Sequence, residues 1–381
     1  MLGARKVAIS GGDKFRDDHS LAFDGTDDHI RIPSTTYDVD GSTHSFVFWC
    51  KRDTTNTWDV VLGKHDSGPE SFVIFSNSTN TLTIEGDSSD DSATGAIENT
   101  AGVWYHFVVT CNSGTVQMYE NGKAITMSDS TIGSNITLDS IGGSGTSNCL
   151  DGSISEVAFY NSVLSASQVA TIYNGREPYN HKEGVASGNL THWYRMGDGT
   201  LDTTRHFTSP VTEGGVLSDE SQNSYLGTDL ADAMMTDGVW TGWGSNEVDE
   251  DSGAIKITYK SHTNSSGAYT YLKDSKGLTS DLTIGKVYKV SYQAKVGSGS
   301  VTTNISESGG FNVTGNATTS TSFVDYAIYI VCTSETDHYF YVNNMSADQE
   351  MWYQNIKVQE VVGNTGVIVN MASNQFSGDT P

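Results

Sequence analysis

The chain has 381 residues, and its 46 acidic side chains outnumber 21 basic ones to give a formal net charge of −25. A chain this acidic repels nucleic-acid phosphates and anionic membrane surfaces, so we expect neither nucleic acid as a partner nor insertion into a membrane. Hydrophobic residues make up 36% of the chain, and its many glycine and small polar residues favour short strands and loops over helices. The length exceeds one ordinary domain and predicts two.

The chain start argues against a secretory leader, and the cysteines argue against a disulfide framework or a metal site. Residues 1–10 lack the apolar core of a secretory leader, and no apolar run is long enough to cross a membrane. Cys50, Cys111, Cys149 and Cys332 have the spacing of neither a disulfide framework nor a metal site. We therefore expect four buried free thiols.

Five strand-like blocks, four of them rich in aromatic and β-branched residues, occupy the first part of the chain. They are residues 22–30, 45–49, 104–110, 118–123 and 141–143. The first block contains a tight acidic turn between two extended segments. In the fourth, Asn121-Gly122 supplies the two positive φ angles of a type I′ turn and predicts a β-hairpin.

Residues 150–173 change their hydrophobic period midway. Residues 154–160 alternate, with even-numbered side chains on one side and odd-numbered ones on the other, which predicts a strand. Ser165 and Gln168 then form a capping-box pattern for a short helix over residues 166–173. The residues expected on its apolar face and at its end are Val169, Ile172, Tyr173 and Asn174-Gly175.

The order of these six blocks resembles that of a laminin-G-like (concanavalin-A-like) jelly roll over residues 18–180. The resemblance implies an antiparallel β-sandwich, a fold that hosts lectins, adhesion modules, enzyme accessory modules and virion proteins. The family's closing strand usually carries an Asp before the Glu, and these carboxylates often help to hold a structural calcium; here Ser155 precedes Glu156. Asp24, Asp27 and Asp28 remain as candidate calcium ligands, with a solvated acidic turn as the alternative.

A further block at residues 190–198 resembles the tail piece that follows laminin-G-like domains in marine bacteriophage structural proteins. From residue 199 to residue 230 the strand pattern gives way to Thr, Ser, Pro and Gly, which indicates an inter-domain linker.

Strand-like runs recur after the linker. They cover residues 254–259, 267–272, 287–295, 322–331, 338–342 and 351–358. Their order and spacing resemble a carbohydrate-binding-module-like jelly roll of bacterial glycanases and phage tail proteins. The closing strand of such modules usually carries an Asp before the Asn, whereas here Gln354 precedes Asn355, so this sequence also lacks the module's usual metal carboxylate.

The predicted fold class is all-β, with two antiparallel β-sandwich (jelly-roll) domains, the first bearing one short helix after its closing strand. The domains are an N-terminal arm at 1–17, the laminin-G-like sandwich at 18–180, a linker at 181–230, the second jelly roll at 231–360 and a C-terminal tail at 361–381. The arm is expected either as an extra edge strand of its own domain or clamped by neighbouring subunits. The tail has no evident partner strand and is expected to dock onto a neighbour.

One acidic stretch raises the question of catalysis. Glu247, Asp249 and Asp251 alternate as the paired carboxylates of retaining glucanases do. Val248 and Glu250 would then share the opposite face, which cannot pack on a core. Together with the turn residues on either side, this favours a solvated acidic loop, and we expect no active site and no enzymatic activity.

Sugar rings stack on exposed aromatic side chains, whose faces are apolar. Two candidates lie outside the periodic strands of the first domain, Trp58 and Tyr37, and burial or a subunit interface is the alternative for every candidate. The candidates in the second domain are Trp240, Trp243, Tyr269 and Tyr271, with Tyr339 or Tyr341.

These features predict a non-enzymatic structural or adhesion protein of a virus particle: a bacteriophage tail, fibre or capsid-surface appendage that contacts host surface glycans. The expected partners are other copies of the chain, as a trimer, and other virion proteins, and the expected location is the virion surface. A secreted bacterial adhesin and an accessory carbohydrate-binding module of a glycanase are the alternatives.

Overall fold

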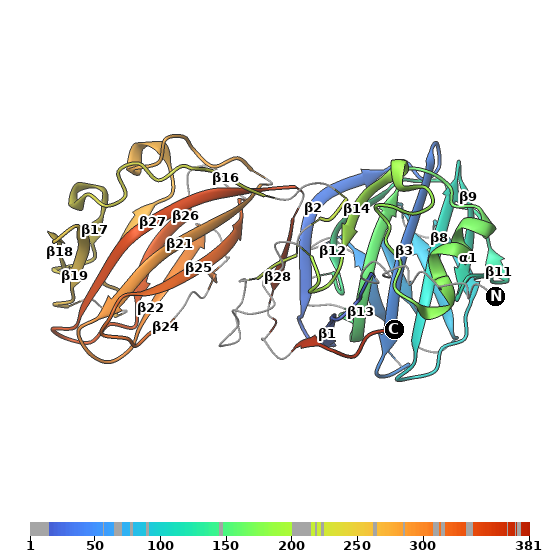
Figure 1. Cartoon of the computed structure of the whole chain (residues 1–381), viewed down its shortest axis with the longest axis horizontal. Helices are drawn as coiled ribbons and strands as arrows, with labels where there is room; N and C mark the ends of the chain where they lie inside the picture. Colours follow the sequence, from blue (N-terminus) through green and yellow to red (C-terminus); the bar gives the residue numbers. More distant parts are fainter. Residues whose placement is uncertain are drawn as a thin grey trace, which may run out of the picture.

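The computed structural model describes most of the chain. The described residues are 15–55, 57–64, 71–76, 79–88, 91–144, 148–199, 215–217, 219–221, 225–261, 265–284, 286–307, 312–313, 317–332, 338–363, 365–369, 371 and 375–381. Most of the N-terminal arm, residues 1–14, lies outside them. The described chain is almost entirely antiparallel strand and forms two β-sandwiches side by side (Figure 1), which confirms the predicted fold class.

Two sheets, A and B, make the first sandwich. In sheet order, sheet A contains β10 (Lys123–Ala124), β9 (Thr115–Glu120), β8 (Trp104–Asn112), β3 (Thr43–Arg52), β13 (Asp151–Tyr160), β1 (Ser20–Asp24) and β29 (Phe376–Ser377), and β14 (Leu190–Tyr194) also pairs with β13. Sheet B contains β11 (Met127–Asp129), β7 (Ser92–Ala96), β6 (Thr81–Glu85), β5 (Phe72–Phe75), β4 (Asp59–Gly63), β12 (Ile136–Ile141), β2 (His29–Tyr37), β28 (Gly366–Val369) and β15 (Gly215–Leu217).

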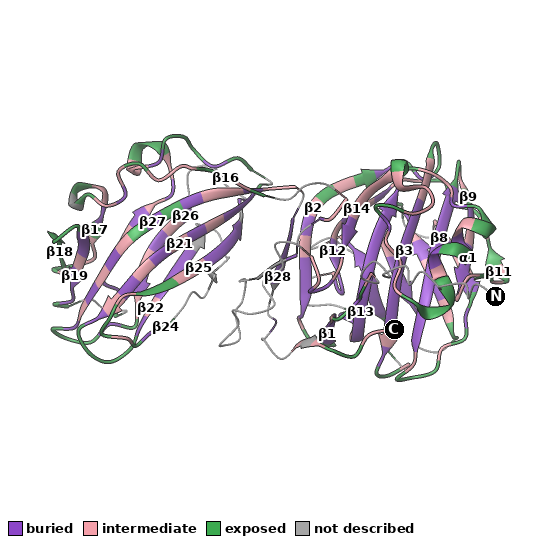
Figure 2. Cartoon of the chain, in the orientation of Figure 1, coloured by how far each residue is buried: buried purple, intermediate pink, exposed green. Residues whose placement is uncertain are grey.

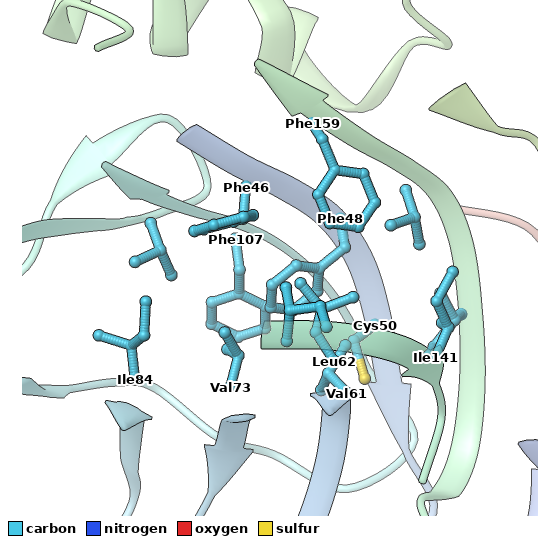
Figure 3. Close-up of a cluster of buried hydrophobic side chains, with 14 of the residues drawn as sticks. Phe46, Phe48, Cys50, Val61, Leu62, Val73, Ile84, Phe107, Ile141 and Phe159 are labelled. Carbon is cyan, nitrogen blue, oxygen red and sulfur yellow. The ribbon is translucent and has the colours of Figure 1, made fainter. Parts of the chain in front are cut away.

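The core of the first sandwich lies between these sheets. Figure 3 shows the rings of Phe46, Phe48, Phe107 and Phe159, from sheet A, gathered among aliphatic side chains that include Leu62 of sheet B. Alternate residues of β3 and β8 face this core, and both strands are buried along nearly their whole length, as purple shows in Figure 2. The four cysteines are buried free thiols, as predicted.

The local signals of the sequence are confirmed. The helix α1 (Ala166–Tyr173) begins with the capping box of Ser165 and Gln168 and ends at Asn174, which has left-handed φ and ψ angles. Its buried residues pack with Val47 and Val108 on the outer face of sheet A (Figure 1). Asn121 and Gly122 both have positive φ angles, of 50° and 78°, in the turn that joins β9 and β10. The 3₁₀ turns are η1 (Asn174–Arg176), η2 (Ser187–Asn189), η3 (Asp237–Val239) and η4 (Asp274–Lys276).

Sheets C and D make the second sandwich. Sheet C contains β18 (Glu247–Asp251), β19 (Ala254–Thr258), β27 (Glu350–Val362), β21 (Val287–Val296) and β25 (Val324–Val331), with β16 (Tyr225–Asp229) pairing with β27. Sheet D contains β17 (Thr241–Gly242), β20 (Ala268–Tyr271), β26 (His338–Asn343), β22 (Val301–Glu307) and β23 (Asn312–Val313), with β24 (Ala317–Thr318) pairing with β22.

The C-terminal segment does not extend toward a neighbouring subunit as expected. It returns to the first sandwich, where β28 pairs with β2 and β15, and β29 pairs with β1. The sequence does not reveal the partner strands of this segment, because β2 lies more than 300 residues earlier in the chain. The second sandwich is therefore an insertion between β15 and β28 (Figure 1).

The predicted linker also belongs partly to the first sandwich. Residues 190–194 form β14 and pair with β13, and Tyr194 is 1% exposed in the core. Where the two sandwiches meet, Val287, Tyr329 and Val361 pack with Val367 of β28. No helix among the described residues combines the length and apolar character needed to span a bilayer.

Candidate functional site

The outer face of sheet D carries a cluster of five aromatic side chains, which we call the aromatic face: Trp243, Tyr269, Tyr271, Tyr339 and Tyr341. Strand alternation produces it, because Ala268 and Thr270 of β20 and His338, Phe340 and Val342 of β26 point into the core. The tyrosines at the intervening positions therefore point outward, and each is partly exposed.

Register brings the tyrosines of the two strands together. Tyr269 lies opposite Tyr341 and Tyr271 lies opposite Tyr339. Ring centroids are 5.7 Å apart for the pairs Tyr269–Tyr271, Tyr271–Tyr339 and Tyr339–Tyr341. Trp243, in the turn after β17, lies 4.7 Å from Tyr269 and 5.6 Å from Tyr341. The result is a continuous patch of rings on one face of the second sandwich.

Polar groups border this patch at both ends. The Nζ atom of Lys273 lies 4.6 Å from the ring centroid of Tyr271. At the other end Asn344 donates from Nδ2 to the hydroxyl of Thr302, 3.0 Å away, and its backbone N–H donates to Oδ1 of Asn343. Burial, together with the neighbouring Tyr339, raises the pKa of the Tyr341 hydroxyl, so this group keeps its proton and can donate a hydrogen bond.

The structure separates the predicted sugar-stacking residues. Trp243, Tyr269 and Tyr271 come together in the aromatic face, joined by both Tyr339 and Tyr341. Trp240 does not: it is 5% exposed, stacks on Tyr353 at 5.5 Å and donates from Nε1 to the carbonyl of Met234, so it is a core residue and offers no stacking face. Tyr37 is likewise buried, with 6% exposure, in the core of the first sandwich.

Trp58 is the remaining candidate of the first domain. Its side chain is 44% exposed just before β4, far along the sequence from the aromatic face. Among the described residues, no aromatic ring packs against Trp58. Sequence reasoning missed the polar border formed by Lys273, Thr302 and Asn343. Lys273 follows the end of β20, and Thr302 lies opposite Asn343 only through the pairing of β22 with β26.

The acidic stretch at residues 247–251 is a strand and not the loop that we expected. It forms β18 at the edge of sheet C, and Ser252 and Gly253 make the tight turn to β19, with φ angles of 56° and 83°. Val248 packs against the second core. The sequence pattern excluded this because Glu250 lies on the same face, but Glu250 stays exposed beyond the edge of the core. Exposed carboxylates on an edge strand discourage pairing with other chains.

The closing strand of the first sandwich also differs from its predicted alternation. A bulge at Ser155 and Glu156, where φ is 50°, puts both Ile154 and Val157 into the same core. It turns the Glu156 carboxylate toward Arg195, whose Nε atom lies 3.0 Å from Oε1. Asp17, from the N-terminal segment, accepts hydrogen bonds from the Ser155 hydroxyl and so brings a carboxylate to the position where the sequence lacks one.

The remaining predicted metal ligands, Asp24, Asp27 and Asp28, lie together in the turn between β1 and β2. Each offers a carboxylate oxygen, and these oxygens all lie within 4.8 Å of one another.

Comparisons with known proteins agree with the fold. Residues 24–170 match the family model described as the concanavalin A-like lectin/glucanases superfamily. No curated protein matches the chain.

Solved structures with similar folds include a putative carbohydrate binding protein from Bacteroides ovatus, with 17% identity, a TM-score of 0.39 and coverage of 54% of this chain and 56% of that one. The heptameric SAP-like pentraxin from Limulus polyphemus has 18% identity and a TM-score of 0.33, and the match covers 41% of this chain and 82% of the pentraxin. The CBM22-1 xylan-binding domain from Paenibacillus barcinonensis has 13% identity and a TM-score of 0.28, over 37% of this chain and 97% of the domain. With TM-scores below 0.5, these likenesses carry no conclusion about this chain.

Proposed function

We propose that the chain is a non-catalytic glycan-binding protein and that the aromatic face of sheet D holds the sugar. The observation that carries the proposal is the convergence of Trp243, Tyr269 and Tyr341, with their neighbours, on the outer face of one sheet. A buried core would use such rings inside the sandwich, as it uses Trp240. Five rings held together at the surface instead favour a ligand that presents flat, apolar faces.

The chemistry of this surface suits a carbohydrate. Sugar rings present C–H groups to aromatic faces, and tyrosine hydroxyls exchange hydrogen bonds with sugar hydroxyls. The cross-strand contacts among the tyrosines limit the motion of each ring, so little conformational entropy is lost on binding. Asn343 and Lys273 at the two ends add polar contacts that would fix the orientation of a chain of sugars.

The side chains that the structure describes on this face support binding without hydrolysis. Glycoside hydrolysis requires two carboxylates on either side of the bond that breaks. Strand alternation puts Thr302, Asn304 and Asn343 beside the tyrosines, and none of these is acidic. The alternating carboxylates of β18 belong to sheet C, the other sheet of the sandwich.

Affinity electrophoresis in gels that contain xylan, glucomannan or alginate tests the proposal. We expect at least one polysaccharide to retard the full chain, and Trp243→Ala and Tyr269→Ala to weaken that retardation about tenfold or more, as aromatic hot spots do. Trp352→Ala is the matched control, because Trp352 is a partly exposed indole on the outer face of sheet C. Retardation by none of the three, or equal loss in the control, would overturn the proposal.

The finer role, a bacteriophage virion protein located on the particle surface with other copies and other virion proteins as partners, stays a proposal supported by the resemblance of residues 190–198. The C-terminal segment no longer supports it, because that segment packs on its own sandwich. An accessory carbohydrate-binding module or adhesin would use the same aromatic face. Mass photometry separates them: a discrete oligomer such as a trimer favours the particle role, and a monomer favours the module.

A further inference from the structure

The turn between β1 and β2 concentrates three carboxylates at one point. Asp24 ends β1, Asp28 directly precedes β2, and the side-chain oxygens of these two residues and Asp27 lie within 4.8 Å of one another. Asp24 is exposed and Asp27 is half-buried, whereas Asp28 is only 1% exposed. No cysteine or histidine of the described chain joins this group, so the potential ligands are oxygen atoms only.

The carboxylate of Asp28 is incompletely satisfied by the protein. Its Oδ2 atom accepts a hydrogen bond from the backbone N–H of Asp24, 2.9 Å away, and another from the side-chain amide of Gln375. Its Oδ1 atom is buried and has no hydrogen-bond partner among the described residues. A buried carboxylate oxygen without a donor is costly, and a bound cation would remove that cost. The unpaired Oδ1 atom therefore indicates a bound ligand at this turn independently of the acidic cluster.

Gln375 connects the turn to the returning C-terminal segment. It directly precedes β29, whose two residues pair with Ser20 and Leu21 of β1. Beyond β29, Asp379 forms an ion pair with Lys51, and its carbonyl accepts from the Ser20 hydroxyl at 2.7 Å. Beyond β28, the last residues of the chain are thus held to the first sandwich by β29 and a few polar contacts, and Gln375 links them to the acidic turn.

We propose that Asp24, Asp27 and Asp28 bind one calcium ion and that this ion fastens the C-terminal segment to the first sandwich. Calcium fits better than magnesium because it takes several carboxylate and carbonyl oxygens in a flexible geometry, whereas magnesium keeps most of its waters and uses one or two carboxylates. The Gln375 amide already occupies Oδ2 of Asp28, and Oδ1 is free to bind the ion, so one carboxylate joins the ion to the returning segment.

Isothermal titration of calcium chloride into the chelator-treated full chain tests the binding step. We expect one saturable site with a dissociation constant of about 10⁻⁴ to 10⁻³ M, the range of extracellular calcium modules, and weaker binding of magnesium chloride. The double variant Asp24→Asn, Asp27→Asn spares the buried Asp28 and should abolish the site. The matched control Glu247→Gln, Asp249→Asn removes two exposed carboxylates of β18 and should keep it.

Hydrogen exchange on the same proteins tests the fastening step. Calcium should slow amide exchange in residues 375–379 of the full chain and of the control, and leave the double variant unchanged. No saturation by about 5 mM calcium, or equal heats in the double variant, would overturn the site and leave only diffuse counter-ion binding by an acidic surface. Saturable binding that leaves exchange of residues 375–379 unchanged would overturn the fastening role.

Discussion

The hydroxyl of Ser155 lies 2.9 and 3.1 Å from the two carboxylate oxygens of Asp17, a residue 138 positions earlier in the chain. This contact puts a carboxylate from the N-terminal segment beside Glu156, which is 3% exposed. Asp198 completes a group of three carboxylates that faces one arginine, Arg195. His19 pairs with Asp198, Nδ1 to Oδ1, at 2.6 Å. Three carboxylates thus share one arginine, and two of them, Asp17 and Glu156, are buried.

The first prediction concerns the pH dependence of stability. Burial, and next the charge of Glu156, raises the pKa of Asp17 to about 8, and burial raises that of Glu156 to about 7. The folded chain thus binds more protons than the unfolded chain between about pH 4 and pH 8, and the free energy of unfolding falls as pH rises through this window. Asp17→Asn should flatten this dependence, measured as Tm from pH 5 to pH 8.5, by about 2 °C or more.

The neighbouring Asp18→Asn is the control for this measurement. Asp18 is exposed, so its replacement should leave the slope of Tm against pH as it is in the unaltered chain. If Asp17→Asn and the unaltered chain show the same slope, Asp17 does not hold a proton in the folded state.

Local signals in the sequence predict local structure well here, and long-range pairing accounts for the rest. The capping box at Ser165 and the Asn121-Gly122 turn depend on neighbouring residues only, and both are confirmed. The bulge at Glu156 breaks an alternation that the sequence alone shows as continuous, because its partner, the half-buried Arg195, comes from another segment. The position of residues 366–369 depends on a strand on the far side of an inserted domain.

The candidate site follows the same division. Alternation in residues 268–271 and 338–342 predicts outward tyrosines, but only the pairing of β20 with β26 puts Tyr269 opposite Tyr341. Trp240 and Trp243 are three residues apart in a segment without a repeating pattern. Nothing in that segment reveals that one indole enters the core and the other lies at the surface.

The two tryptophans therefore yield a paired prediction. Trp240→Ala removes a buried indole that contacts Phe340 and Tyr353, and it should destabilise the second sandwich by about 3–5 kcal/mol. Trp243→Ala should change Tm little and reduce polysaccharide binding. Thermal unfolding and affinity electrophoresis of both variants check this, and similar Tm losses in the two would contradict the assignment of Trp243 to a binding surface.

The returning C-terminal segment leads to a third prediction. β28 lies between β2 and β15 in sheet B, and its Val367 is fully buried where the sandwiches meet. Removal of residues 365–381 should therefore lower the Tm of the first sandwich. It should not change the number of chains in the oligomer in solution. Thermal unfolding and mass photometry of the truncated chain test both parts. A shift from oligomer to monomer with unchanged Tm would instead restore the assembly role that we first expected.

The insertion of the second sandwich makes the last prediction possible. Its ends lie side by side, because Tyr225 of β16 pairs with Val362 of β27, and the strands that flank the insertion are also paired, Leu217 with Gly366. Adjacent ends tolerate excision, since each part keeps its own core. Residues 225–362 expressed alone should fold with a cooperative unfolding transition and bind the same polysaccharide as the full chain. The remaining chain, with β15 and β28 joined by an Asn-Gly turn, should fold and bind none. Polysaccharide binding by the remaining chain would move the site to the first sandwich, where Trp58 is the exposed aromatic side chain to test.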